Sequence, residues 1–167
     1  MLRIKKLSKE EIDEIARNYE QIMKKFFAQV REKPITAREY ALLLRKSYKK
    51  SFMLVLTSKK ILGFAWITKK GKEWTLEEIF VTEMRKGYGT KLMKFLLREA
   101  RKKKVKKINL NVHVKNKKAI KFFKKLFISY FIINTSQNKL FYLFFIFFSK
   151  RFFIKFHQIL YIHIFKI

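Results

Sequence analysis

The sequence predicts an α/β fold of the α+β kind, with a mixed central sheet and the element order β-α-α-β-β-β-α-β-α. Three observations support this prediction. Strand-like segments follow one another between Ser51 and Val81, separated by tight turns, which indicates an antiparallel meander. Two helical patterns precede the meander, each opened by a capping box. After it, a strand, a glycine loop, a helix and a strand follow, and this unit requires a parallel crossover pair.

The first part of the chain contains one short strand and then the helices. We expect the strand at Leu2–Lys6. Ser8–Glu11 is a capping box, and apolar residues recur behind it at helical spacing as far as Val30. This segment is one amphipathic helix or two joined helices, and it ends before Pro34, the only proline. Thr36–Glu39 is a second capping box and opens the next helix.

The middle of the chain contains the meander and the crossover unit. Its expected strands are 51–57, 61–68, 73–81 and 108–114. The helix after the glycine loop carries Leu92, Leu96 and Ala100 on one face and ends in a basic run, which suits the helix dipole. Asn116 is expected to cap the last predicted helix.

Composition limits the classes of function. A chain of 167 residues suits one domain, and the absence of cysteine excludes disulfides and thiolate metal sites. The three histidines lack a metal-ligand spacing, so no metal is expected. The N-terminus has no apolar signal region, so we expect a cytoplasmic location. A net charge of +29 would attract polyanions, but lysine at solvated positions in an AT-rich gene is the better explanation, so no specific nucleic-acid partner is expected.

The last 40 residues differ from the rest. Residues 128–167 contain no Gly, Pro, Ala, Val, Asp or Glu, and Phe and Ile make up 19 of the 40. We therefore expect a domain at 1–127 and an atypical tail at 128–167. The tail is open to three interpretations: an out-of-frame translation, a membrane-surface segment or an unusual native pair of strands. Its longest apolar run, Leu140–Phe148, has nine residues, too few to span a bilayer.

The glycine loop is the segment that indicates chemistry. Gly87 and Gly89 lie between a strand and a helix, where successive main-chain N–H groups and the helix dipole favour an anion. Arg85, Lys86 and Lys91 add full positive charges. These features predict a pyrophosphate cradle. The loop is neither a P-loop nor a dinucleotide fingerprint, because GxxxxGK[ST] is absent and Leu92 takes the place of the third glycine.

The segment from Leu76 to Phe127 resembles the signature of the GNAT acetyltransferase superfamily. That family has a [QR]xxGx[GA] phosphate loop, and a later Asn-xx-Ala-xx-Phe-Tyr helix, which stands here as Asn116-Lys-Lys-Ala-Ile-Lys-Phe-Phe123. The resemblance covers about residues 1–127. It implies a GNAT fold whose final two strands are replaced by the atypical tail. Within the family, the sequence is most similar to the polyamine and diamine acetyltransferase branch.

The resemblance also implies an activity. Acetyl-CoA would lie between strands 73–81 and 108–114, and a primary amine would attack its thioester directly in a ternary complex. Glu77 would be the general base or a substrate ligand, with Glu78 on the other sheet face. The residues expected to contact the cofactor are Phe80, Val81, Arg85, Lys86, Gly87, Tyr88, Gly89, Thr90, Asn116 and Phe123.

Two departures from the family pattern affect this activity. Met84 stands where Gln or Arg is expected, and Phe123 stands where a tyrosine usually protonates the leaving thiolate. The alternatives are a non-catalytic basic module that binds RNA or an anionic membrane, or a truncated inactive acetyltransferase. The acceptor, a small amine or a protein amino group, is not determined, and a homodimer is expected only because many relatives are dimers.

Overall fold

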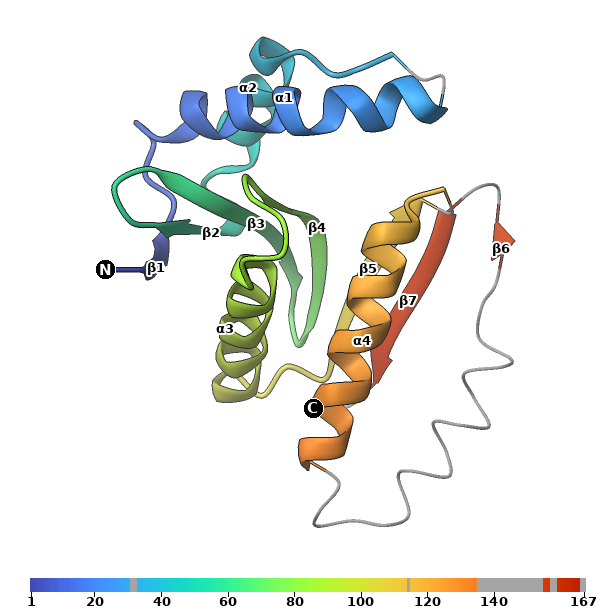
Figure 1. Ribbon diagram of the computed structural model, residues 1–167. Helices are drawn as coiled ribbons and strands as arrows, with labels where there is room; N and C mark the ends of the chain where they lie inside the picture. Colours follow the sequence, from blue (N-terminus) through green and yellow to red (C-terminus); the bar gives the residue numbers. More distant parts are fainter. Residues whose placement is uncertain (31–32, 114, 135–154, 157–158, 166–167) are drawn as a thin grey trace. The chain divides into compact units, whose positions relative to one another are not determined.

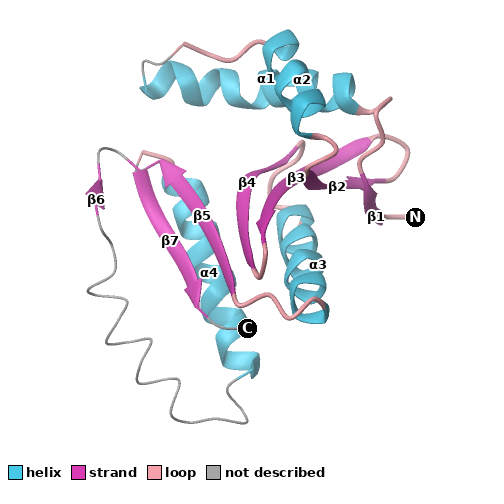
Figure 2. Cartoon of the chain, turned by 180° about the vertical axis from the view of Figure 1, so that it is seen from behind, coloured by secondary structure: helices cyan, strands magenta, loops and turns pink. Residues whose placement is uncertain are grey.

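The computed structural model describes residues 1–30, 33–113, 115–134, 155–156 and 159–165. The chain forms two compact units, Met1–Asn109 with Ile164–Ile167, and Leu110–His163, which we describe separately. The elements, drawn in Figures 1 and 2, are β1 (Arg3–Lys6), α1 (Ile12–Val30), α2 (Ala37–Ser47), β2 (Ser51–Thr57), β3 (Ile61–Lys70), β4 (Glu73–Val81), α3 (Tyr88–Lys102), β5 (Lys107–His113), α4 (Lys117–Asn134), β6 (Lys155–Phe156) and β7 (Ile159–Phe165).

The first unit is built on a sheet that confirms the predicted meander. Strands β1 to β4 pair antiparallel in the order of the chain. β5 follows β4 in the strand order, and α3 connects the two as the helix of the parallel crossover. The mixed sheet and the order of its first nine elements therefore agree with the prediction from sequence.

A β-bulge interrupts the pairing of β3 with β4. Trp66 pairs with Glu78 and the next residue of β3, Ile67, pairs with Leu76, so Glu77 has no partner opposite it. An extra residue reverses the alternation of side chains beyond it. The expectation that Glu77 and Glu78 point to opposite faces is therefore wrong. Both lie on the face that packs against α1 and α2, because strict alternation fails at the bulge.

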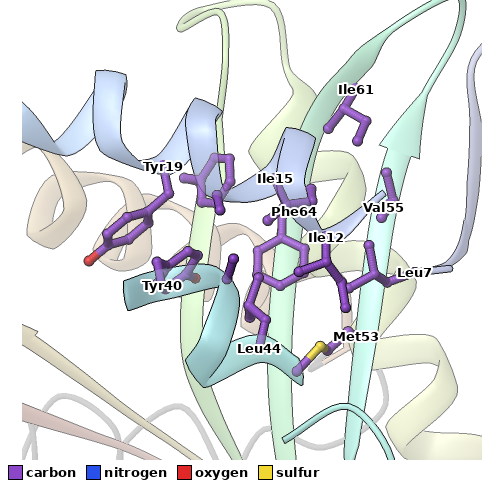
Figure 3. Packing of buried hydrophobic residues seen from close by; sticks show 13 residues of the cluster. Leu7, Ile12, Ile15, Tyr19, Tyr40, Leu44, Met53, Val55, Ile61 and Phe64 are labelled. Atoms are coloured by element: carbon purple, nitrogen blue, oxygen red, sulfur yellow. The ribbon is translucent and has the colours of Figure 1, made fainter. Parts of the chain in front are cut away.

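Helices cover both faces of this sheet. In Figure 1, α1 and α2 lie on one face and α3 on the other. α1 is a single continuous helix, and the α1/α2 face has its own core cluster, shown in Figure 3. The buried members of that cluster are Leu7, Ile12, Ile15, Ala16, Tyr19, Tyr40, Ala41, Leu44, Met53, Val55, Ile61, Phe64 and Phe80. Burying one large apolar side chain stabilises a fold by roughly 1.5–3 kcal/mol, so this cluster fixes α1 and α2 on the sheet.

Caps determine where the first helices begin. At α2, the Thr36 hydroxyl accepts from the main-chain N–H of Glu39, and the Glu39 carboxylate accepts from the N–H of Thr36, at 3.2 and 2.9 Å. This is the complete capping box that the sequence predicts. At α1, the Glu11 carboxylate accepts from the N–H of Ser8 at 2.9 Å, which is the half of the predicted box in which Glu11 reaches back.

The second unit contains the end of β5, α4 and the β6–β7 pair. Asn116 caps α4 as predicted, because its side-chain oxygen accepts from the N–H of Ala119 at 3.1 Å. α4 continues to Asn134, past the expected end of the family-like segment, and β6 pairs antiparallel with β7. A final pair of strands was one of the three interpretations of the tail left open by the sequence. Much of the predicted tail, 135–154 with 157–158 and 166–167, lies outside the described residues, and the boundary at 127 stays a prediction.

Among the helices of the described ranges, none is both long enough and apolar enough to cross a bilayer.

Candidate functional site

The loop between β4 and α3 is the first part of the candidate site. α3 begins at Tyr88, and its first helical hydrogen bond runs from the N–H of Lys91 to the carbonyl of Gly87 at 3.0 Å. The N–H groups of Tyr88, Gly89 and Thr90 therefore have no acceptor within the helix. No side chain caps this helix N-terminus. Three main-chain donors are thus left for a ligand at the positive end of the helix dipole.

The shape of this loop depends on two left-handed residues. Gly87, the N-cap, has φ +76°, and Arg85 has φ +64°. A side chain at Gly87 would be strained by its φ, although among the described residues no atom beyond its chain neighbours lies within 4 Å of where its Cβ would be. Arg85, Lys86 and Gly87 are exposed. The main chain here is therefore open to solvent, and Arg85 and Lys86 flank it with positive charge.

The end of β4 leads into this loop. Phe80 is buried in the core of the α1/α2 face, so its side chain is structural, and only its main chain is available to a ligand. Val81 is half-buried and pairs with Gly63 of β3. A Cβ at Gly63 would lie 2.9 Å from the Leu92 side chain and 3.2 Å from the Phe80 carbonyl oxygen. Gly63 thus lets α3 pack closely against the strands that support the loop.

The second part of the site is the bulge of β4, where two carboxyl groups share one face. Glu77 is exposed, and its carboxylate accepts a short hydrogen bond from the Thr68 hydroxyl of β3. Glu78, the next residue, is half-buried. Desolvation raises the pKa of Glu78 to about 8, and a hydrogen bond from the N–H of Ile79 offsets only part of this rise. Glu78 is therefore mostly protonated at neutral pH.

Two tyrosines from different helices lie near Glu78. Tyr19 of α1 and Tyr40 of α2 stack with ring centroids 3.8 Å apart and planes at 9°. Both side chains are labelled in Figure 3. Tyr19 also meets Phe80 edge-on at 6.0 Å. Burial raises the pKa of both tyrosines, and the negative charge of Glu78 raises each further. Both phenols therefore stay protonated at neutral pH and can donate hydrogen bonds.

The remaining predicted residues belong to the second unit. The side-chain oxygen of Asn116 is used to cap α4, so only its NH2 group is left to donate to a ligand. Phe123 is buried at 4% exposure and contacts Phe122 edge-on with centroids 5.1 Å apart. In the part of the chain that the structure describes, no group of three metal-ligating side chains is found.

Sequence reasoning missed the importance of Glu78, Tyr19 and Tyr40. The two tyrosines were assigned only as apolar positions of helices, since their spacing fits a core face. Glu78 was placed on the wrong face because a bulge has no signature in this strand. The available signal was the Glu-Glu pair between the apolar residues Leu76 and Ile79.

The chain was compared with known families, curated proteins and solved structures. The model of the acetyltransferase (GNAT) family matches residues 14–127. This chain belongs to the GNAT acetyltransferase family. GNAT proteins are N-acetyltransferases, and the loop and bulge described above lie within the matched residues. No curated protein matches the chain.

Solved structures agree in fold with this GNAT chain. It is similar to the PaiA N-acetyltransferase of Thermoplasma acidophilum in complex with coenzyme A, with 16% identity and TM-score 0.64 over 75% of this chain and 87% of that one. The ribosomal-protein-S18-alanine N-acetyltransferase of Escherichia coli has 24% identity and TM-score 0.60 over 75% and 76%. YncA of Salmonella typhimurium, solved with its cofactor acetyl-CoA, has 16% identity and TM-score 0.57 over 75% and 78%.

Proposed function

We propose that this protein transfers the acetyl group of acetyl-CoA to a primary amine by direct attack within a ternary complex. The single observation that carries the proposal is the uncapped start of α3, with left-handed Gly87 and three free main-chain donors, in a chain of the GNAT family. The acceptor stays open between a small amine and a protein amino group.

The residues of the Gly87 loop suit the diphosphate of coenzyme A. A diphosphate needs several convergent donors and compensating charge, which the N–H groups of residues 88–90 and the side chains of Arg85, Lys86 and Lys91 can supply. The open space at Gly87 admits a ligand close to the main chain. The family pattern further assigns the main chain of Phe80 and Val81, the NH2 group of Asn116 and the side chain of Phe123 to the cofactor.

The bulge of β4 suits the acceptor amine. A protonated amine must lose a proton before it attacks, and the acceptor of that proton works best with a pKa near the working pH. Glu78, with its raised pKa, meets this requirement, and exposed Glu77 can attract the ammonium group before deprotonation. We therefore assign Glu78 as the proton acceptor. Glu77, which the sequence predicts as the base or a substrate ligand, is assigned as the substrate ligand.

Phe123 cannot protonate a leaving thiolate, because it has no hydroxyl group. A thiol of pKa about 8.5 is a tolerable leaving group without an acid, so water can provide the proton. Acetyl-CoA supplies the acetyl group as a thioester, and this chain's residues bind it and prepare the amine. We expect a slow enzyme for this reason.

Calorimetric titration with acetyl-CoA, followed by a thiol-release assay with a panel of primary amines, tests the proposal. We compare the wild type with R85A/K86A and with the charge-matched control K49A/K50A, whose lysines are exposed elsewhere in the first unit. The loop variant should bind acetyl-CoA at least about tenfold more weakly, whereas the control should bind almost as well as the wild type. Absence of binding by the wild type at millimolar cofactor would reject the proposal.

A further inference from the structure

The hydroxyl group of Tyr40 is buried without a hydrogen-bond partner in the described part of the chain. Tyr40 as a whole is 2% exposed. A buried hydroxyl is normally paired, because leaving it unpaired sacrifices the hydrogen bonds it made to water. An unpaired one in a native fold therefore calls for a functional or structural reason.

Three contacts determine where this hydroxyl lies. The complete capping box at Thr36 fixes the first turn of α2, and the N–H of Tyr40 donates to the Thr36 carbonyl at 2.9 Å. The ring stacks on Tyr19 of α1. It also belongs to the apolar cluster between the helices and the sheet, visible in Figure 3. The position of the hydroxyl is thus set by the fold and not by a flexible surface rotamer.

Glu78 lies beside the cluster that contains Tyr40. Its cross-strand partner Trp66 packs against that cluster, and Phe80, two residues further along β4, belongs to it and contacts Tyr19. The polar side chains of this region are those of Glu77, Trp66, Tyr19 and Tyr40, and the charge of Glu78 acts on both tyrosines. Trp66 already donates its indole N–H to the Ser51 hydroxyl at 2.9 Å. Glu77 is an acceptor that is bonded to Thr68. Of these donors, the hydroxyl group of Tyr40 is the one that is buried without a partner in the described part of the chain.

We propose that Tyr40 is a positioning residue for Glu78, its hydroxyl donating to the ionised carboxylate directly or through one water. When Glu78 loses its proton, the new negative charge lies in a desolvated place and attracts the unpaired hydroxyl of Tyr40. The contact therefore stabilises the form of Glu78 that can accept a proton and restrains the direction in which the carboxylate points. Its catalytic meaning rests on the proposed acetyl transfer, whereas the contact itself does not.

The test follows the titration of Glu78 by NMR of a 13C-labelled carboxyl group, assigned with E78Q, in wild type, Y40F and the control Y48F. Tyr48 is also on the α2 side of the fold, but its hydroxyl donates to the Leu7 carbonyl at 2.9 Å. Removing a donor from a charged acceptor should raise the pKa of Glu78 by about one unit or more in Y40F. Y48F should leave it unchanged. An unchanged pKa in Y40F overturns the proposal.

A second variant covers the case in which Y40F does not fold. 3-Fluorotyrosine placed at position 40 keeps the ring and hydroxyl but donates more strongly, so the pKa of Glu78 should fall. If neither substitution at position 40 moves it, Tyr40 has no role at Glu78.

Activity gives a separate readout. In Y40F, the apparent pKa of the acidic limb of the kcat/KM profile should rise by as much as the pKa measured by NMR. In Y48F, it should not change. The NMR titration needs no turnover. If the protein shows no acetyl transfer, the proposed function is refuted, but the titration still tests the interaction of Tyr40 with Glu78. A shifted titration with an unshifted pH profile would show that Glu78 is not the base, and would overturn the catalytic role of Tyr40.

Discussion

The bulge of β4 and the loop that follows β4 form two sites of opposite charge. The bulge presents side chains, whereas the loop presents its main chain. At the bulge, Glu77 and Glu78 present side-chain carboxyl groups to the face covered by α1 and α2. At the strand end, the loop around Gly87 presents main-chain N–H groups flanked by Arg85 and Lys86. The loop needs only local conformation, whereas the bulge needs a register and two distant helices. One short segment thus combines a locally encoded anion site with a carboxyl pair that exists only after folding.

The largest expected effect concerns the difference between the two carboxyl groups of the bulge. E78Q should lower kcat/KM for acetyl transfer by roughly 10²–10⁴-fold, the range typical of a lost general base. E77Q should lower it by less than about tenfold, mainly through KM, because an exposed ligand of the ammonium group is screened by water. E73Q, an exposed carboxyl at the start of the same strand, serves as control. Equal losses in E77Q and E78Q would contradict the division of roles.

The next effect concerns stability, and its sign follows from the raised pKa of Glu78. The ordinary pKa is 4.5 and the folded one is about 8, so between these values the folded state keeps a proton that the unfolded state has lost. Stability should therefore fall as pH rises from 4.5 to 8 and level off above it. E78Q should be more stable than wild type at pH 8, by on the order of 2 kcal/mol after allowing for partial exposure.

Urea denaturation of both proteins at several pH values measures this effect. The difference between them should vanish below about pH 4.5, where the carboxyl is protonated in both states. A constant difference at all pH values would mean that packing, and not desolvation of the charge, distinguishes Glu from Gln here.

A third effect separates loop conformation from general backbone strain. G87A forces a side chain into a left-handed conformation. It should lower the free energy of unfolding by about 1 kcal/mol, the usual penalty for an L-residue in that conformation. G71A, at φ +59° in the β3–β4 turn and equally free of neighbours, should cost a similar amount. Only G87A should weaken acetyl-CoA binding, by roughly tenfold. Calorimetry with both variants checks this, and equal weakening would remove the special role of the Gly87 loop.

The smallest effect tests whether the two sites depend on different helices. T36A removes the cap of α2 and should cost about 1 kcal/mol or slightly less, measured by urea denaturation. Because α2 holds Tyr40 near Glu78, T36A should also alter the titration of Glu78. Binding of acetyl-CoA at the other end of β4 should be unchanged. T36S, which keeps the hydroxyl, should restore both the stability and the titration of Glu78. A loss of cofactor binding in T36A would show that the bulge and the Gly87 loop are coupled.

Much of the fold was predictable because its signals are local. The capping box at Thr36, the cap at Asn116 and the alternation of the meander all depend on neighbours within a few residues. The Gly87 loop was predictable for the same reason, since only glycine adopts its conformation without strain. The extent of α4 to Asn134 was not predicted, because the apolar residues after Leu126 lack a helical period that distinguishes helix from strand.

By itself the sequence determined the order of the first nine elements, the start of α3 with its open main chain, and the GNAT family pattern that spans both. Only the tertiary structure decided that Glu78 shares a face with Glu77 and that its charge acts on Tyr19 and Tyr40. The physical reason is that a bulge is fixed by pairing with β3, and desolvation by packing of α1 and α2. Neither depends on the residues next to Glu78 in the chain, so no local pattern could reveal them.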